Sequence, residues 1–187
     1  MGILFQSNPR TQEIYKMVHE TYELKKAMWL EDVFLTWQWW LGVALTVLPW
    51  IFWLFVRKKE HTHRFLYAAF FVMVIAIWLD SFGVQLGLWH YNYEVSPFSP
   101  NYKPWDITLI PVMTMLTIQW FPKAKAWIKG AIYAALIAFV FEPLFVWIGF
   151  VHYPQWEFIF SYPVYFLMYV IASYLYRAKT FNARMPE

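Results

Sequence analysis

After the first 35 residues, apolar residues run in long blocks separated by short polar stretches. A helix needs about 20 mainly apolar residues to cross the ~30 Å hydrocarbon core of a bilayer. Five segments meet or nearly meet that length: residues 36–56, 65–89, 105–121, 127–150 and 158–176. The third is the weakest, because it contains Pro111 and Gln119, and it requires burial between the other helices. The pattern predicts an all-α fold, a polytopic bundle of five transmembrane helices.

The first 35 residues follow a different pattern, that of an amphipathic helix. Asn8 and Pro9 make a favourable N-cap and first-turn pair. Apolar residues then recur at helical spacing opposite a charged face; they are Ile14, Met17, Val18, Leu24 and Met28. We therefore expect an extracytoplasmic amphipathic helix over residues 1–35, on the membrane surface or against the bundle, and a transmembrane domain over residues 36–187.

Composition supports a membrane protein and narrows the classes of function. Hydrophobic residues make up 60% of the chain and charged residues 14%, whereas soluble domains carry about 25% charged residues. This excludes a disordered protein and a nucleic-acid-binding protein, since the aromatic belts expected at the membrane interface account for many of the 13 tryptophans. Cysteine is absent, which removes thiolate metal sites and cysteine nucleophiles.

The basic residues predict how the chain is oriented in the membrane. Ten lie on the side reached after the first, third and fifth segments: Arg57, Lys58, Lys59, Arg64, Lys123, Lys125, Lys129, Arg177, Lys179 and Arg184. Five lie on the other side: Arg10, Lys16, Lys25, Lys26 and Lys103. Because basic residues favour the cytoplasmic side, we expect a multi-pass protein of the cell (plasma) membrane with its N-terminus outside and its C-terminus in the cytoplasm.

Two acidic residues fall near the middle of predicted spans. Asp80 lies about nine residues from the outer end of the second, and Glu142 about eight from the outer end of the fourth, so their depths are similar. An aspartate at this depth costs about 2.5–3.5 kcal/mol on insertion scales and has to face protein or water. Gly83 and Gly87 share a face with Asp80, and this spacing predicts close approach of a partner helix.

Other polar and aromatic residues gather at the same level and predict a pocket in the outer half of the bundle. Proline interrupts the outer halves of three helices at Pro111, Pro143 and Pro163. The candidate ligand-binding residues are Asp106, Gln85, Thr114, Tyr162, Tyr165, Trp89 and His90. Asp106 has a second interpretation, because an acid in the first turn of a helix also stabilises the helix dipole.

The two carboxyls, Asp80 and Glu142, are the candidate catalytic or proton-holding pair. Two acids in a low-dielectric site do not both ionise readily, and a retained proton suits general acid catalysis, proton relay or binding of a cationic ligand. The alternative is that each is a protonated hydrogen-bond donor that fixes helix packing. No metal site or cofactor is expected, because the histidines lack the necessary partners and nucleotide-binding and hydrolase motifs are absent.

Several short motifs resemble an uncharacterised family of small multi-pass membrane proteins of endospore-forming Gram-positive bacteria. The matching stretches are Leu79-Asp80 with Gly83, residues 87–91, Pro104-Trp105-Asp106 with Pro111-Val112, Gln119, Phe121-Pro122, Phe141-Glu142-Pro143 with Phe145, and Ser161-Tyr162-Pro163 with Tyr165. The resemblance implies about five helices and no known activity. More distantly, the buried acids are similar to those of emopamil-binding sterol isomerases and bacterial carotenoid cyclases, although no catalytic residue transfers.

These patterns favour a protein that binds a small lipid-like or hydrophobic molecule in the outer-half pocket, with a role in envelope or spore physiology. Membrane lipids are the expected surroundings. A membrane enzyme that uses Asp80 or Glu142 as general acid in an isomerisation or cyclisation is the first rival. A proton or ion pathway, or a small transporter formed as a homo-oligomer, is the second.

Overall fold

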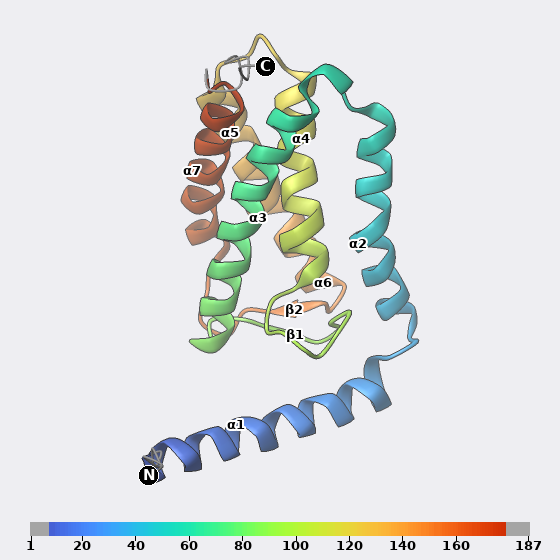
Figure 1. Cartoon of the computed structure of the whole chain (residues 1–187), viewed down its shortest axis with the longest axis vertical. Helices are drawn as coiled ribbons and strands as arrows, with labels where there is room; N and C mark the ends of the chain where they lie inside the picture. The colour runs from blue at the N-terminus through green and yellow to red at the C-terminus, as the bar shows by residue number, and fades with distance from the viewer. Residues whose placement is uncertain (1–7, 179–187) are drawn as a thin grey trace, which may run out of the picture.

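The computed structural model describes residues 8–178, which form six continuous helices and one two-stranded sheet (Figure 1). Helix α1 (Pro9–Met28) continues as a π-helix (Trp29–Val33), and α2 (Trp37–Val56) leads through a 3₁₀ turn (Lys59–His61) into α3 (Thr62–Gln85). A second π-helix (Pro104–Leu109) opens α4 (Ile110–Trp120). Helix α5 (Ala126–Leu136), a third π-helix (Ile137–Phe141) and α6 (Glu142–Trp147) form one rod, and α7 (Phe158–Tyr176) ends the bundle. The strands are β1 (His90–Tyr91) and β2 (Val151–His152).

Four of these helices are long and apolar enough to cross a membrane, which fits the predicted membrane protein. They are Trp37–Val56, Lys59–Gln85, Ala126–Trp147 and Phe158–Tyr176. The remaining predicted span, α4 with its opening π-helix, is shorter and runs beside the others in the same direction as α2 and α7 (Figure 1). Lys179 and Arg184, which entered the orientation prediction, lie outside the described residues.

The core of the bundle lies where α3, α4, α5 and α7 meet. Alanines bring the helices close together, and large side chains such as Phe65, Met115 and Tyr169 fill the space between them. Helix α2 packs against the π-helix that opens α4, where Trp50 Nε1 donates to the backbone oxygen of Ile107 over 3.0 Å. The short α4 is thus buried between longer helices, as its proline and glutamine led us to expect.

A single glutamine ties α4 to the turn between α2 and α3. Gln119 is buried, its Nε2 donates to the backbone oxygen of Val56 over 2.8 Å, and its Oε1 accepts from the backbone nitrogen of Lys58 over 2.9 Å. Both hydrogen bonds engage backbone groups released where α2 ends. The polar residue that weakened the third predicted span is thus a clamp between helices.

Two predicted helix ends were wrong by several residues, for one physical reason. The segments expected to run to residues 89 and 150 end as helices at Gln85 and Trp147. Shortly after each end, a glycine adopts a left-handed conformation, Gly87 with φ of +70° and Gly149 with φ of +81°. Glycine adopts this conformation without the steric cost borne by other residues and reverses the chain there. Each chain then enters a strand, and β1 and β2 pair at what we call the sheet end of the bundle (Figure 1).

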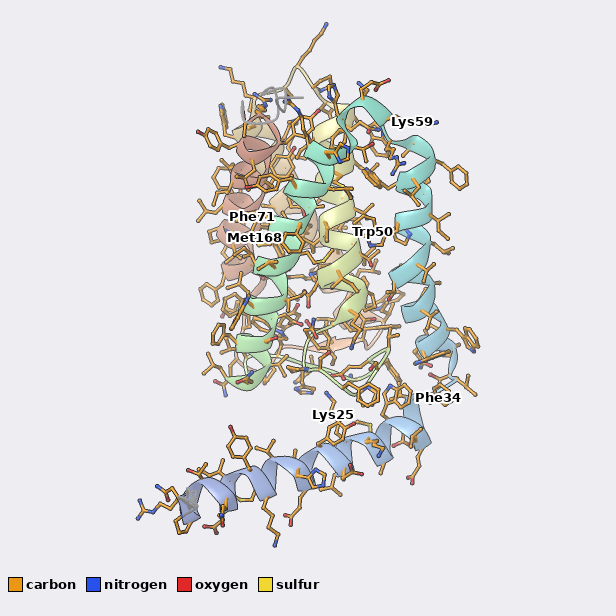
Figure 2. The ribbon with its side chains drawn as sticks, in the orientation of Figure 1. Lys25, Phe34, Trp50, Lys59, Phe71 and Met168 are labelled. Carbon is orange, nitrogen blue, oxygen red and sulfur yellow. The ribbon has the colours of Figure 1, made fainter. Side chains whose placement is uncertain are left out.

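Helix α1 lies beyond the sheet end, across the direction of the other helices (Figure 1). None of its side chains is buried, and Ile14 and Val18 are more than half exposed. Its C-terminal half is attached to the loop after β1: Lys25 Nζ lies 2.8 Å from Glu94 Oε1, and Trp29 Nε1 donates to the Glu94 backbone oxygen over 2.8 Å. Figure 2 shows Lys25 on the side of α1 that faces the bundle. Helix α1 is therefore attached to the bundle through contacts at its C-terminal half.

Candidate functional site

A cavity of about 210 Å³ lies between α3 and α7 and reaches from mid-bundle to the sheet end. Met168 lines its inner end, halfway along the bundle (Figure 2). Three carboxyls line it, those of Asp80, Asp106 and Glu142. The structure thus brings together the two predicted mid-membrane acids and a third from the start of α4.

Asp80 is fully engaged by hydrogen-bond donors. Its Oδ1 accepts from Trp89 Nε1 and from the Tyr91 hydroxyl, both at 2.6 Å, and its Oδ2 accepts from the backbone nitrogen of Tyr102 at 2.7 Å. Three donors leave neither oxygen of this carboxyl without a hydrogen bond. Because the donors come from the chain that follows α3, Asp80 fixes the path of that chain at the sheet end.

Asp106 lies in the π-helix Pro104–Leu109, with its carboxyl next to the side chains of Asp80 and Asn101. It is 2% exposed, and no described residue forms a hydrogen bond with its Oδ2. Two adjacent carboxyls in an apolar site share a proton more readily than they hold two negative charges. Since Asp80 already accepts from three donors, the Asp106 Oδ2 is the oxygen of this pair that has no donor among the described residues.

Glu142 is the first residue of α6, and a π-helical turn aims it into the cavity. Its N–H donates to the oxygen of Ile137, five residues back, and the following Pro143 has no N–H to continue the ordinary pattern. The Glu142 Oε1 accepts from the Tyr165 hydroxyl at 3.1 Å, and the Ser161 hydroxyl lies beside the same carboxyl. Its Oε2 is buried and has no hydrogen-bond partner among the described residues.

The indole groups that line the cavity all donate within the protein. Trp89 Nε1 donates to Asp80, Trp105 Nε1 to the Tyr165 hydroxyl over 2.9 Å, and Trp156 Nε1 to the Ser161 hydroxyl over 2.9 Å. Their N–H groups are therefore occupied, and what they offer to the cavity is aromatic surface.

Two tyrosines outside the long helices have pKa values raised by burial and by the carboxyls of the cavity. Burial raises the pKa of Tyr91, and the nearby carboxyls of Asp80 and Asp106 add to the rise. Burial likewise raises the pKa of Tyr153, followed by the effects of Glu142, Asp80 and Asp106. Tyr153 is therefore under the influence of all three acids at once, whereas no described lining residue is a lysine, arginine or histidine.

The cavity reaches the apolar surface of the bundle along α3. Three of its lining residues on that helix are exposed: Leu79, Phe82 and Leu86 are 42%, 54% and 68% exposed. On the α7 side, Val164 is half-buried. The way from the carboxyls to the outside thus passes between hydrophobic side chains.

The two acids first singled out occupy equivalent positions of an internal repeat. Residues 75–91 recur 62 residues later as residues 137–153, and Asp80 corresponds to Glu142. The identical pairs are Ile75 and Ile137, Ala76 and Ala138, Val84 and Val146, Gly87 and Gly149, His90 and His152, and Tyr91 and Tyr153. The repeat covers the end of one helix, its glycine turn and the strand that follows.

The backbone follows the same repeat. Leu88 N donates to Gly83 O over 2.9 Å, and the equivalent Phe150 N donates to Phe145 O over 2.9 Å. In the antiparallel β1–β2 pair, His90 lies opposite its own counterpart, His152. Two antiparallel strands that pair equivalent residues are related by a local two-fold axis between them. Because α3 and α6 both run toward the sheet end, this axis runs along the bundle, as it does in membrane proteins built from parallel repeats.

One departure from the repeat explains why its two acids differ. At Gly83 the Trp89 ring fills the space of a side chain, since an added Cβ would lie 2.0 Å from the indole. The equivalent positions hold Phe145 and Val151, which leave neither that space nor an indole N–H. Asp80 therefore gains a donor that Glu142 does not have. The prediction that Gly83 and Gly87 admit a partner helix was wrong, because Gly83 accommodates Trp89 from its own segment and Gly87 forms the turn.

The structure distributes the predicted ligand-binding residues unevenly. Asp106, Trp89 and Tyr165 line the cavity with the two candidate catalytic acids, Asp80 and Glu142. Four other predicted residues do not line it, and they are placed as follows. Gln85 and His90 are exposed, Thr114 is buried against the Tyr133 hydroxyl at 2.9 Å, and Tyr162 stacks on Phe139 with centroids 5.9 Å apart.

Several lining residues were not among the predicted site residues: Tyr91, Trp105, Tyr153, Trp156 and Ser161. Two of them, Tyr91 and Tyr153, are counterparts in the 62-residue repeat, so the repeat was the signal in the sequence that could have found them. Within residues 8–178, no three histidine, aspartate or glutamate side chains are grouped so that they could hold a metal ion.

Comparison with protein-family models, curated proteins and solved structures finds no match to this chain. The arguments about its function therefore come from the cavity itself.

Proposed function

We propose that this protein binds a small, predominantly hydrophobic molecule that enters the cavity sideways from the lipid bilayer. The observation that carries the proposal is the course of the cavity, from exposed Leu79, Phe82 and Leu86 on α3 to the buried carboxyls of Asp106 and Glu142. Ligand pockets are mostly apolar with a few polar groups that fix orientation, and this cavity has that character.

The proposal includes a five-span topology in the plasma membrane. The fifth span is α4 with its π-helix, residues 104–120, whose 17 residues extend about 25 Å at the rise of an α-helix and which the neighbouring helices bury. An odd number of crossings agrees with α1 and the end of α7 lying at opposite ends of the bundle (Figure 1). The distribution of basic residues supports a cytoplasmic C-terminus and therefore a position of the sheet end, with the cavity, in the outer half of the membrane.

In this topology α1 lies flat on the outer surface. Its apolar residues, which are exposed in the structure, contact lipid, and its charged face contacts water. A role in envelope or spore physiology, expected from the sequence motifs, remains part of this proposal.

The test is mass spectrometry of lipids and other small molecules retained through gentle purification. Wild-type protein is expected to retain one compound at a stoichiometric level. Leu86→Trp, which narrows the opening, is expected to lose it, whereas Leu66→Trp places the same side chain at an exposed leucine of α3 that does not line the cavity. Absence of any stoichiometric compound from wild type, or equal retention by Leu86→Trp, would contradict the proposal.

A second candidate function is general acid catalysis on such a molecule, favoured by the contact between Asp106 and Asp80. The proton held by that pair would lie in an apolar cavity beside any bound alkene, where protonation begins isomerisation or cyclisation. Conversion of the retained compound by wild type, abolished in Asp106→Asn even at a concentration of the compound that saturates the variant, would support catalysis. Binding with no chemical change on prolonged incubation would exclude it for that compound.

A further inference from the structure

We propose that the ligand is an amphiphile with a protonated amine or ammonium head group, bound between the Asp106 and Glu142 carboxyls, with its hydrocarbon tail passing along α3 into the bilayer. This inference rests on the proposed function and names the class of molecule for the same cavity.

Two buried acceptors of the cavity have no donor within the described residues. Asp106 Oδ2 and Glu142 Oε2 are buried, belong to residues that are 2% and 3% exposed, and have no described hydrogen-bond partner. Buried acceptors without a donor are costly, so a ligand that supplies N–H groups gains more than one that supplies only acceptors.

The indole donors of the cavity and two of its tyrosine hydroxyls are already engaged, which argues against an anionic head group. All three indole N–H groups and the hydroxyls of Tyr91 and Tyr165 donate to protein atoms. With no basic side chain among the described lining residues, a carboxylate or phosphate would find three acids and no counter-charge.

Aromatic surface surrounds the acids and suits the same class of head group. Trp89, Trp105 and Trp156 line the cavity, and the rings of Trp89 and Trp156 meet edge to face with centroids 5.2 Å apart. Cations are attracted to the face of an aromatic ring within about 6 Å of its centre, and most strongly to tryptophan. Free carboxyl oxygens beside tryptophan rings are thus complementary to an ammonium group in charge and in hydrogen bonding.

The tail direction follows from the exposed side of the cavity. Leu79, Phe82 and Leu86 lead from the acids to the surface of α3 and offer only hydrocarbon contact. A single alkyl chain therefore extends from the head group into the surrounding acyl chains without leaving an apolar environment.

The experiment compares three probes of one chain length: dodecylamine, dodecan-1-ol and dodecanoate. Each is titrated calorimetrically into nanodiscs that carry the full-length protein, and the heat from empty nanodiscs is subtracted. We expect wild type to bind the amine at least about tenfold more tightly than the alcohol, since a hydrogen bond to a charged group is worth that factor or more. Dodecanoate is expected to bind most weakly.

Variants assign the preference to the cavity. Glu142→Gln is expected to bring the amine to the affinity of the alcohol. Glu60→Gln controls for net charge, because it removes an exposed carboxyl in the 3₁₀ turn between α2 and α3. If Glu142→Gln fails to fold, Asp106→Asn gives the same comparison. A preference for the amine that survives both Glu142→Gln and Asp106→Asn would overturn the inference.

The outcomes separate this inference from the proposed function. Equal binding of amine and alcohol, both lost in Leu86→Trp, would refute the amine head group and leave a hydrophobic ligand site standing. Binding of all three probes that is unaffected by Leu86→Trp would refute the site itself.

Discussion

His90 and His152 face one another across the β1–β2 pair, with ring centroids 5.1 Å apart, and each is the other's counterpart in the 62-residue repeat. A local two-fold axis passes between them. Asp80 and Glu142 lie ten residues before these histidines in their respective segments, so the axis relates them as well. The cavity is thus lined by two acids at equivalent positions of the repeat, Asp80 and Glu142, and by Asp106 from outside the repeat.

Asp80 and Glu142 are expected to respond differently to neutralisation. Asp80→Asn weakens three hydrogen bonds to a buried carboxyl and turns an amide N–H₂ toward a donor, so we expect the free energy of unfolding to fall by about 2–4 kcal/mol. Glu142→Gln keeps an acceptor for Tyr165, and we expect a change within about 1 kcal/mol. Denaturation of both variants in the same detergent measures the difference. An equal fall in the free energy of unfolding in the two variants would contradict the expected difference between Asp80 and Glu142.

Gly83→Ala is expected to displace the Trp89 indole, because the added methyl group would lie 2.0 Å from it. Overpacking of this kind costs about 1–3 kcal/mol, and the Trp89–Asp80 hydrogen bond is lost with it. The double variant Gly83→Ala/Trp89→Val takes its second residue from the other repeat, where Val151 stands. It should relieve the steric part of the loss, leaving Asp80 one donor short. A double variant no more stable than Gly83→Ala would contradict this account, with Tm in detergent as the measurement.

Gln119→Leu is expected to loosen the connection of α4 to the turn between α2 and α3. It leaves the backbone nitrogen of Lys58 and the backbone oxygen of Val56 without their partner, which costs about 1–3 kcal/mol. Thr117→Val is the matched control, because the Thr117 hydroxyl donates to the oxygen of Met113 in its own helix, and its loss should stay within about 0.5 kcal/mol. Hydrogen exchange of the Lys58 amide should accelerate in Gln119→Leu alone.

The attachment of α1 is expected to depend on pH through Glu94. Burial raises the pKa of this carboxyl, and the hydrogen bond from Lys25 partly offsets the rise. Because the pKa in the folded protein lies above that of the unfolded chain, the contribution of Glu94 to stability is full below its unfolded value. It is lost as pH rises through the folded value. The contribution of Glu94 to the free energy of unfolding should therefore fall as pH increases through that range.

Lys25→Met removes the group that lowers the Glu94 pKa, so the titration should move to higher pH and α1 should be less firmly held once Glu94 ionises. The control is Lys26→Met, since Lys26 forms an ion pair with the half-exposed Glu23 of its own helix, at 3.4 Å. Carbon-detected NMR of the Glu94 carboxyl gives the pKa, and hydrogen exchange in α1 gives the attachment. A Glu94 titration unaltered by Lys25→Met would refute the coupling.

The helices were predictable because length and hydrophobicity determine what can cross a bilayer. The start at Thr36, which caps α2 through its hydroxyl, and the end of α7 at Tyr176 follow from local chemistry that the sequence displays. The ends of α3 and α6 were placed too late, because hydrophobic residues continue past the glycine turns and only the backbone conformation reveals the reversal.

The candidate site was less predictable, since depth along a helix does not specify direction around it. Asp80 and Glu142 were expected at one level and do line one cavity, but their hydrogen-bond partners come from loops such as residues 89–102, whose path no periodicity encodes. Gln85 lies five residues from Asp80, on a different face of α3, and is exposed. The π-helical turns before Glu142 and around Asp106 also rotate the side chains away from regular α-helical positions.

The first copy of the repeat has Gly83 and Trp89 where the second has Phe145 and Val151, and this difference gives the acids of the two copies different roles. The copy with the glycine and the indole uses its acid to hold the chain in place, and the copy without them keeps its acid available. Symmetry thereby supplies two carboxyls to one cavity, and a single departure from that symmetry leaves one of them fully hydrogen-bonded within the protein. The other keeps an oxygen that has no hydrogen-bond partner among the described residues.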